Sequence, residues 1–212
     1  MANNAKIVYN WVDCVAATCS LGESLFVNLT VQDVEKLQTK LQEERLDYQL
    51  ELVGGNIIVM GLEDVTSSEV GARLIAFLNI WVMPRKLGRV TGAAAGFLLP
   101  NETADLRAPD VAFIRAERLK RSPRYFAELV PDLMVEIKSN TDRLEALREK
   151  INLFLELGTQ VGILIDPDRE TVTVCRPAGE PVVLNNNDIL TIPELLPGWE
   201  LPVSQLWPPE FE

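Results

Sequence analysis

Residues 109–138 read PDVAFIRAERLKRSPRYFAELVPDLMVEIK, a stretch in which a polar, partly basic interval separates two short apolar runs. Both runs have the length and composition of buried strands. Asp110 directly precedes the first run, Glu136 lies within the second, and Lys138 follows two residues later. Because residues i and i+2 of a strand point to the same face, Glu136 and Lys138 are expected side by side. Isolated charges are costly to bury, so we expect these three groups to share a cleft or a metal ion.

The segment after this stretch predicts how the second apolar run, 133–137, is built into a sheet. Residues 142–157 carry apolar side chains at three- and four-residue spacings, which is typical of an amphipathic helix, and Gly158 marks its end. The apolar run 161–165 then predicts a strand buried on both faces. This order predicts a right-handed crossover between parallel neighbours, so 133–137 is the expected central strand.

The flanking segments complete a mixed α/β domain. Upstream, the pattern predicts a helix at 30–44, a hairpin at 50–60, a helix from 66 to 84 and a strand or bulged hairpin at 90–99. Further strands are expected at 111–114, 171–175 and 181–184, followed by a proline-rich tail that wraps the surface irregularly. We therefore expect one domain at 25–212, with a central mixed sheet flanked by helices, after an N-terminal extension at 1–24.

The composition excludes several classes of chemistry. The chain has 212 residues and no histidine, which excludes Ser-His-Asp triads, Cys-His dyads and histidine–metal sites. Its three cysteines form no CxxC pair, which favours a reduced cytoplasmic protein without disulfides or a zinc site. No run is long and apolar enough to span a bilayer, and Asp13 interrupts the apolar part of the N-terminus, so neither a membrane nor a signal peptide is expected. Acid–base chemistry must use carboxylates, lysine, tyrosine, cysteine or metal-bound water.

The charge distribution qualifies the choice of partner. The net charge of −11 argues against nucleic acid. Residues 73–150, however, hold 14 Lys and Arg against 10 Asp and Glu, so the basic-leaning part of the chain surrounds the opening stretch. A solvated loop is the simpler interpretation of the basic interval 115–124.

The carboxylates and the lysine suit metal-dependent hydrolysis. Asp110 and Glu136 offer the hard oxygen atoms that Mg²⁺ prefers, and a lysine nearby can orient or deprotonate an attacking water. The pattern resembles the PD-(D/E)xK nuclease superfamily. It consists of Pro-Asp, an interval of 26 positions from Asp110 to Glu136, and then Glu-x-Lys. A wider resemblance, from about 50 to 207, is to the Uma-two family of restriction endonucleases in that superfamily. The segments that carry it are TSSE at 66–69, GFLLP at 96–100, RAPDV at 107–111, VPDLMVEIKS at 130–139, LIDP at 164–167 and LPGW at 196–199.

This resemblance implies a restriction-endonuclease-like fold and the hydrolysis of DNA phosphodiester bonds with Mg²⁺, or with Mn²⁺. It implies Asp110 and Glu136 as metal ligands, with a contribution from the Ile137 carbonyl, and Lys138 as the catalytic lysine. Glu69 matches an accessory catalytic acid, although many members carry a histidine near this position and this chain has none. The extension before residue 25 has no match in the family. A homodimer is expected by analogy with enzymes that cut both strands.

Each candidate also has a structural interpretation. Glu69 is equally suited to closing a capping box with Thr66, and Asp110 to a turn. Glu136 and Lys138 can form a same-face ion pair of little energetic value. Lys150 of the long helix is within reach of phosphate, but a solvated helix face is the expected place for it.

Two other functions remain open on the sequence. The acidic charge favours a non-catalytic interaction module that retains the nuclease fold. A metal-dependent hydrolase of a small phosphoester is favoured if a pocket, rather than a groove, surrounds the motif.

Overall fold

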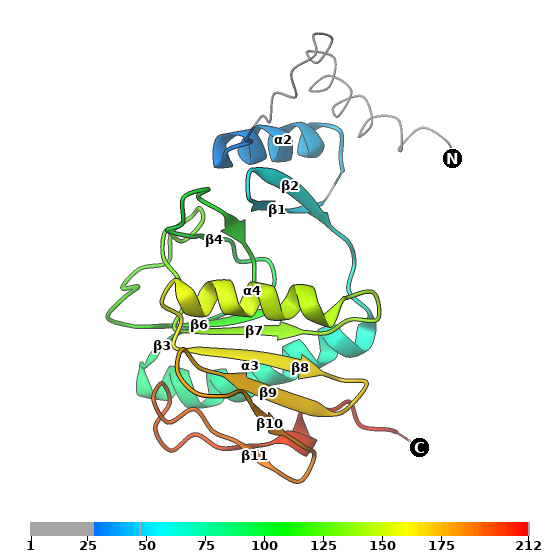
Figure 1. Cartoon of the computed structure of the whole chain (residues 1–212), viewed down its shortest axis with the longest axis vertical. Coiled ribbons are helices and arrows are strands. Elements are labelled where there is room, and N and C mark those ends of the chain that lie inside the picture. Colours follow the sequence, from blue (N-terminus) through cyan, green and yellow to red (C-terminus); the bar gives the residue numbers. More distant parts are fainter. Residues whose placement is uncertain (1–27, 47, 212) are drawn as a thin grey trace.

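The structure, a computed structural model, describes residues 28–46 and 48–211; the predicted extension at 1–24 lies outside the described residues. The described chain forms a six-stranded mixed sheet, a four-stranded antiparallel sheet and a short two-stranded sheet (Figure 1). The helices are α2 (Val31–Glu43), α3 (Val65–Arg85), α4 (Leu144–Glu156) and the 3-10 helix η1 (Val203–Gln205). The strands are β1 (Gln49–Val53), β2 (Asn56–Met60), β3 (Gly88–Gly92), β4 (Phe97–Leu98), β5 (Leu106–Arg107), β6 (Val111–Arg115), β7 (Leu133–Ile137), β8 (Val161–Asp166), β9 (Thr171–Cys175), β10 (Val182–Leu184), β11 (Ile189–Leu190) and β12 (Leu201–Pro202).

The six-stranded sheet confirms the predicted mixed α/β architecture. Its strand order is β10-β9-β8-β7-β6-β3, with β7 parallel to β8 and the other neighbours antiparallel. Helix α4 connects β7 to β8, as the crossover predicts. Every residue of β7 and β8 is buried, which explains their nearly continuous apolar sequences.

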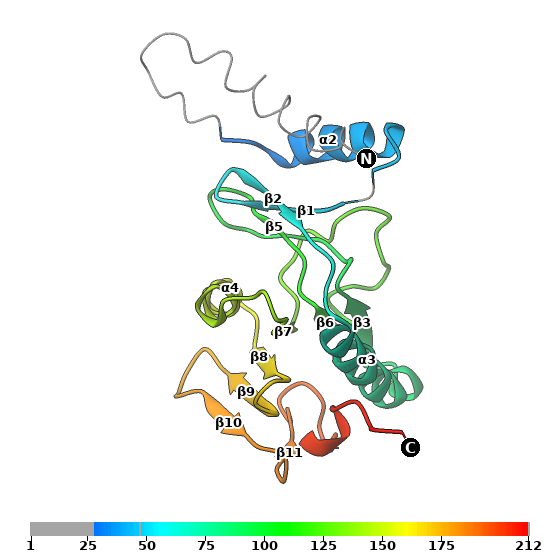
Figure 2. The ribbon, with the colours of Figure 1, turned by 90° about the vertical axis from the view of Figure 1, so that its right-hand side faces the viewer.

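Helices cover both faces of this sheet, and strand alternation decides which side chains meet which helix. Seen end-on, the sheet lies between α3 and α4 (Figure 2). Phe113 and Val135 belong to the cluster that packs on α3, whereas Ala112 and Met134 belong to the cluster that packs on α4. The alternation places Glu136 on the α4 side with Met134.

The four-stranded sheet, in the order β2-β1-β5-β4, is covered by α2 (Figure 1). The predicted hairpin forms its β1–β2 pair, and Gly54 and Gly55 make the turn with φ of +54° and +76°. Such values suit a two-residue hairpin turn and favour glycine. Val34 of α2 packs on Leu50 and Leu52 of β1, which joins the helix to the sheet.

Three predictions of local structure were wrong. The segment 90–99 is not a hairpin, because β3 pairs with β6 in the large sheet and β4 pairs with β5 in the small one. Helix α3 is capped by Asp64, whose Oδ1 accepts a hydrogen bond from the Ser67 N–H at 2.9 Å, and not by Thr66. The tail does not merely wrap the surface, since Trp199 and Leu206 are buried in the core on the α3 side of the sheet.

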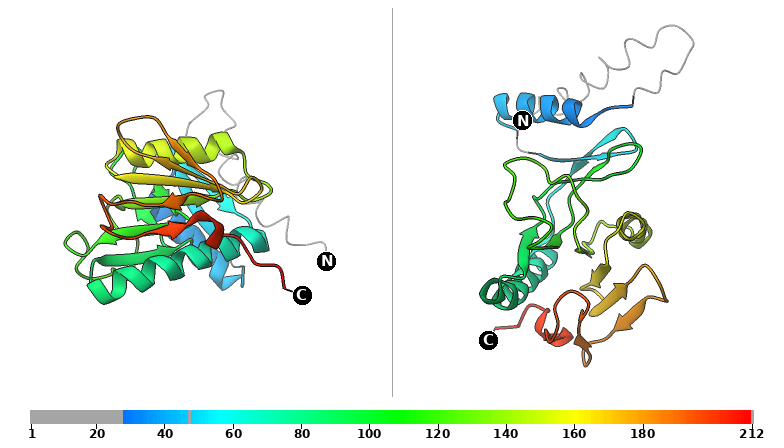
Figure 3. Two further views of the ribbon diagram at one scale, coloured as in Figure 1. Left: turned by 90° about the horizontal axis from the view of Figure 1, so that it is seen from below. Right: turned by 90° about the vertical axis from the view of Figure 1, so that its left-hand side faces the viewer.

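The C-terminal segment therefore forms part of the fold. Figure 3 shows it, in orange to red, running beside the sheet and α3. Strands β11 and β12 pair within it. None of the helices in the described part of the chain is long and apolar enough to cross a membrane.

Candidate active site

Asp110 and Glu136 come together where β6 begins and β7 ends. The antiparallel register that pairs Val111 with Val135 brings Asp110 next to the end of β7. Asp110 Oδ2 accepts a hydrogen bond from the Ile137 N–H at 2.6 Å. The carboxylate of Asp110 therefore serves as the acceptor for this main-chain N–H at the end of β7. The structure thus brings together the two carboxylates that the sequence indicated as candidate metal ligands.

Glu136 is held by a lysine that the sequence had placed in solvent. Its side chain is 4% exposed, and its Oε1 lies 3.0 Å from Lys150 Nζ. Lys150 projects from α4 and is itself buried, so the predicted solvated helix face is wrong for this residue. Its Nζ also lies 3.1 Å from Glu51 Oε1 and donates a hydrogen bond to the Ala108 carbonyl at 2.9 Å.

Glu51 extends this contact into the four-stranded sheet. It lies on β1 with only 3% of its surface exposed. Its Oε1 accepts a hydrogen bond from the Ala108 N–H at 2.8 Å, and its Oε2 lies 3.0 Å from Arg107 Nε. Glu51, Arg107, Glu136 and Lys150 therefore form a buried ion-pair network of two carboxylates and two cations, which joins both sheets to α4.

Lys138 follows Glu136 as predicted, but its ammonium group is turned to another partner. Lys138 Nζ lies 2.5 Å from Asp168 Oδ2, in the turn between β8 and β9. The hydrogen bond to Asp168 raises the pKa of Lys138 above its ordinary value. Asp168 is 59% exposed, and an ion pair with one such partner is weak. Lys138 can therefore exchange this partner at little cost.

Glu69 is engaged by a neighbour on its own helix. Its side chain pairs with Arg73, one turn along α3, at 3.7 Å. Because Asp64 is the N-cap, Glu69 lies too far into the helix to close a capping box, which removes that alternative. The role of Glu69 as an accessory acid stays a prediction.

Glu63, which the sequence did not indicate, lies closer to Asp110. Burial and the charge of Asp142 raise its pKa, while a hydrogen bond with Asp110 acts in the opposite direction. The charge of Glu63 in turn adds to the raised pKa of Asp110. Nothing in the sequence marked Glu63, since it falls in the irregular segment between β2 and α3.

Burial perturbs both central carboxylates. It raises the pKa of Asp110 to about 6, although the Ile137 N–H and the charge of Lys150 oppose the shift. It raises the pKa of Glu136 to about 8, against the attraction of Lys150. Two neighbouring acids with raised pKa values are typical of functional sites, because each would gain from a bound cation.

The basic side chains of the interval 115–124 do not surround these carboxylates. Arg115 and Arg118 lie 3.9 Å and 2.9 Å from the buried carboxylate of Asp132. Arg115 ends β6, roughly 16 Å from Asp110 at the rise of an extended strand, and Arg118 lies in the turn beyond it. Around the carboxylate pair the added charges are acidic, with Asp142 near Glu63 and both Asp142 and Asp166 near Lys138.

The donor set fits a hard divalent cation. Asp110 and Glu136 supply carboxylate oxygens from neighbouring strands, and Mg²⁺ commonly binds through one or two carboxylates while it keeps several waters. Among the residues that the structure describes, no three Asp, Glu, Cys or His side chains are gathered closely enough to enclose a metal ion. A site of two carboxylates completed by water is therefore the arrangement that these residues suit.

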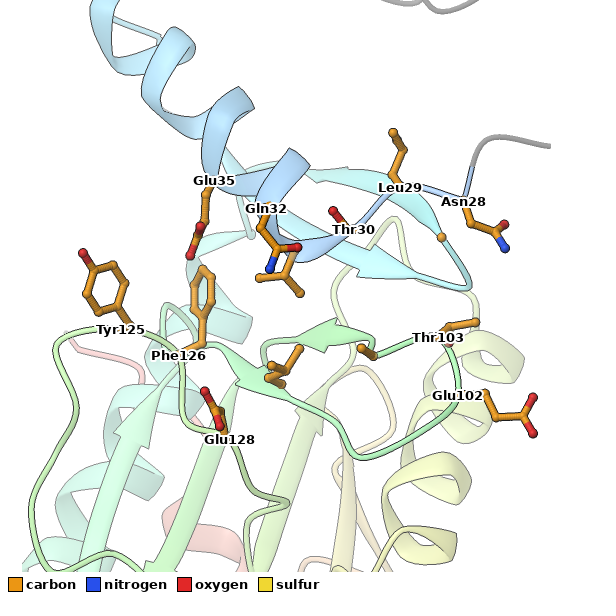
Figure 4. Close-up of a pocket in the computed structure, with 14 residues that line it drawn as sticks. Asn28, Leu29, Thr30, Gln32, Glu35, Glu102, Thr103, Tyr125, Phe126 and Glu128 are labelled. Carbon is orange, nitrogen blue, oxygen red and sulfur yellow. The ribbon is translucent and has the colours of Figure 1, made fainter. Parts of the chain in front are cut away.

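A cavity lies elsewhere, between α2 and the loops at 101–104 and 125–128 (Figure 4). Its volume is about 720 Å³, and neither Asp110 nor Glu136 lines it. Figure 4 shows carboxylates from Glu35, Glu102 and Glu128 around it, and among the described residues no lysine or arginine lines it. Such a lining does not suit a phosphoester, so this cavity gives no support to a small-phosphoester hydrolase.

Comparison with known proteins assigns the chain to a family. Residues 31–204 match the model of the Uma2 family, which is the Uma-two family named above and is described as "Putative restriction endonuclease". A crystal structure from Anabaena variabilis, described as "a putative nuclease belonging to DUF820", has the same fold, with a TM-score of 0.67 and 24% sequence identity. The similarity covers 74% of this chain and 88% of that one. No curated protein matches the chain.

Proposed function

Since the chain belongs to the Uma2 family of restriction endonucleases, we propose that it is a metal-dependent endonuclease that hydrolyses DNA phosphodiester bonds. Mg²⁺ is the proposed ion, and Mn²⁺ is its alternative. The observation that carries the proposal is the pair formed by Asp110 and Glu136. These carboxylates meet at the ends of β6 and β7, and burial raises the pKa of both.

Each residue of the site has a proposed task. Asp110, Glu136 and the Ile137 carbonyl would hold the ion. When bound, the ion would stabilise negative charge on the phosphate and lower the pKa of a water molecule. Lys138 orients or deprotonates the attacking water and offsets charge on the phosphate, for which it leaves the exposed Asp168. Glu69 is kept as an accessory acid, since its ion pair with Arg73 is half-exposed and weak.

The acidic surroundings support the requirement for a cation. Asp64 and Asp142 add negative charge near Glu63, beside Asp110. A DNA phosphate approaching these carboxylates is repelled unless a divalent cation offsets their charge. We further propose a cytoplasmic homodimer, because two copies of one site can cut two antiparallel strands.

The test is DNA cleavage by the purified protein. We expect supercoiled and linear DNA to be cut with Mg²⁺ or Mn²⁺ and to survive in EDTA. Asp110→Asn and Lys138→Ala are expected to reduce the rate at least a hundredfold, because they remove a ligand and the group beside the water. Glu149→Gln, which changes an exposed acid of α4, should cut like the wild type. Cleavage by Lys138→Ala at the wild-type rate would overturn the assignment.

The second candidate is an interaction module that retains the fold without catalysis. The observation in its favour is Lys138, which is bonded to Asp168 instead of to Asp110 or Glu136. Calorimetric titration with Mn²⁺ separates the two functions. The nuclease should bind Mn²⁺ and lose it in Asp110→Asn, whereas the module should bind none.

A further inference from the structure

Lys150 is a buried cation to which the proposed function gives no task. Its side chain is 7% exposed, and three oxygen atoms surround its Nζ. These are Glu51 Oε1 at 3.1 Å, Glu136 Oε1 at 3.0 Å and the Ala108 carbonyl oxygen at 2.9 Å. The Ala108 carbonyl accepts a hydrogen bond from Nζ, and the two carboxylates are its ion-pair partners, so protein groups surround the buried ammonium group. Lys150 is therefore unable to contact DNA and acts through its neighbours.

Glu51 is as fully engaged as Lys150. Its Oε1 faces Lys150 and accepts the hydrogen bond of the Ala108 N–H, and its Oε2 pairs with Arg107. With both oxygens bound by protein groups, Glu51 is unsuited to be a metal ligand. Its charge instead compensates Lys150 in a place where a single buried cation would be costly.

These contacts fix both proposed metal ligands. Lys150 holds Oε1 of Glu136 in an ion pair at 3.0 Å, and among the residues that the structure describes no group donates a hydrogen bond to this buried oxygen. Ala108 precedes Asp110 by two residues, and its N–H is bound by Glu51 while its carbonyl is bound by Lys150. One ion pair thus orients the Glu136 carboxylate and anchors the backbone that leads to Asp110.

We propose that Glu51 and Lys150 are positioning residues of the metal centre, which hold Asp110 and Glu136 ready for a divalent cation. This inference rests on the proposed function, because it concerns the same two ligands. Residues that orient metal ligands commonly alter metal affinity or activity 10- to 100-fold when they are replaced.

The test uses a charge-neutral double variant of the full chain. Lys150→Met alone leaves two buried carboxylates without their cation, so it is combined with Glu51→Gln, which preserves the net charge. The matched control is Arg148→Met with Glu149→Gln, which makes the same changes on the exposed face of α4. Mn²⁺ affinity is measured by calorimetry, folding by circular dichroism, and cleavage as kcat and KM for DNA.

We expect Glu51→Gln/Lys150→Met to bind Mn²⁺ at least tenfold more weakly than the wild type, and the control to match the wild type. The kcat should fall while the KM for DNA stays within twofold, because Lys150 does not reach the substrate. If the double variant fails to fold, Arg107→Gln, which loosens Glu51 alone, should still weaken Mn²⁺ binding about threefold. Wild-type Mn²⁺ affinity in a folded double variant, or in Arg107→Gln where only that variant folds, would refute the inference and leave the nuclease proposal intact. Absence of Mn²⁺ binding in the wild type would overturn both.

Discussion

At the scale of single residues, the strongest interactions of the site are buried and the weakest are exposed. Lys150 and Glu136, which form one ion pair, are both less than 10% exposed. Asp168, which forms an ion pair with Lys138, is 59% exposed. Removing one partner of a buried pair costs about 3–5 kcal/mol, and an exposed pair contributes about 0–1 kcal/mol. The structure thus combines a buried ion pair at Glu136 with a lysine, Lys138, whose exposed ion pair is easily exchanged.

Asp110 should make the metal-free protein less stable as the pH rises. Its pKa is raised from 3.8 to about 6, so the fold favours the protonated form, and its contribution is present below pH 4 and lost as the pH passes 6. Asp110→Asn removes this dependence. We expect the variant to exceed the wild type in free energy of unfolding by about 1–3 kcal/mol at pH 8, and to equal it at pH 4.

Urea unfolding in EDTA at the two pH values checks this expectation. Glu136 also destabilises the protein as the pH rises, and the charge of Asp110 adds to its raised pKa, so Asp110→Asn relieves part of this loss and shifts the difference in the same direction. Asp33→Asn is the control, because hydrogen bonds from Thr30 lower the pKa of Asp33 and its ionised form therefore stabilises the fold. This variant should be less stable than the wild type at pH 8, the opposite of Asp110→Asn. An Asp110→Asn difference that stays the same at pH 4 and pH 8 would contradict the argument.

The sequence indicated the two proposed ligands, Asp110 and Glu136, but not the residues that contact them. Asp110 and Glu136 could be found because a charge next to or inside an apolar strand is unusual. Lys150 has the helical spacing of the core, three residues after Leu147 and four before Phe154, but its charge favoured the solvent. Glu51 stands between apolar neighbours on β1, and only the packing of the second sheet against α4 makes this position buried.

At the scale of elements, the position of α4 depends on the glycine beneath it. A Cβ at Gly162 of β8 would lie 2.5 Å from Cγ2 of Ile151, the residue after Lys150. Gly162→Ala should therefore push α4 away from the sheet and lower the free energy of unfolding by about 1–3 kcal/mol, as overpacking does. Mn²⁺ binding should weaken as well, since α4 carries Lys150.

Gly61→Ala is the matched control for this change. A Cβ at Gly61 would meet nothing within 4 Å, and its φ is not positive. Urea unfolding should place Gly61→Ala close to the wild type. A Gly162→Ala variant as stable as Gly61→Ala would contradict the prediction. It would show that the close packing of Ile151 on Gly162 does not fix the position of α4.

Elements with strong local signals were predicted well, and elements defined by distant partners were not. Helix α4 and its crossover follow from apolar spacing and from Gly158. The strands β3 and β4 lie close together in the chain but join different sheets, because their partners β6 and β5 are separate segments. Strands of two residues such as β4 and β5 carry no period at all, so the second sheet was not expected.

At the scale of the whole molecule, the C-terminal segment completes the core instead of lying outside it. Trp199 is 4% exposed and packs with the α3 side of the large sheet. Trp199→Ala should lower the free energy of unfolding by about 3–5 kcal/mol, as expected for a large aromatic removed from a core. Phe211→Ala, at a residue that is 88% exposed, should change it by less than about 0.5 kcal/mol.

Thermal or urea unfolding of the two variants tests whether this segment is a structural part of the domain. Equal stability of Trp199→Ala and Phe211→Ala would show that the segment is dispensable. Its prolines predicted an irregular path, which is largely correct. An irregular path does not exclude burial, however, and Leu196 and Leu206 of this segment are buried.

The buried ion-pair network also bears on how the protein is made. A polypeptide leaving the ribosome exposes Glu51, Asp110 and Glu136 before α4 has been synthesised, and Lys150 is still missing from that intermediate. Until the helix arrives, Glu136 lacks its ion-pair partner, although Arg107 is already present to pair with Glu51. A truncated product that ends before α4 would therefore lack the contacts by which Lys150 joins Glu51 to Glu136.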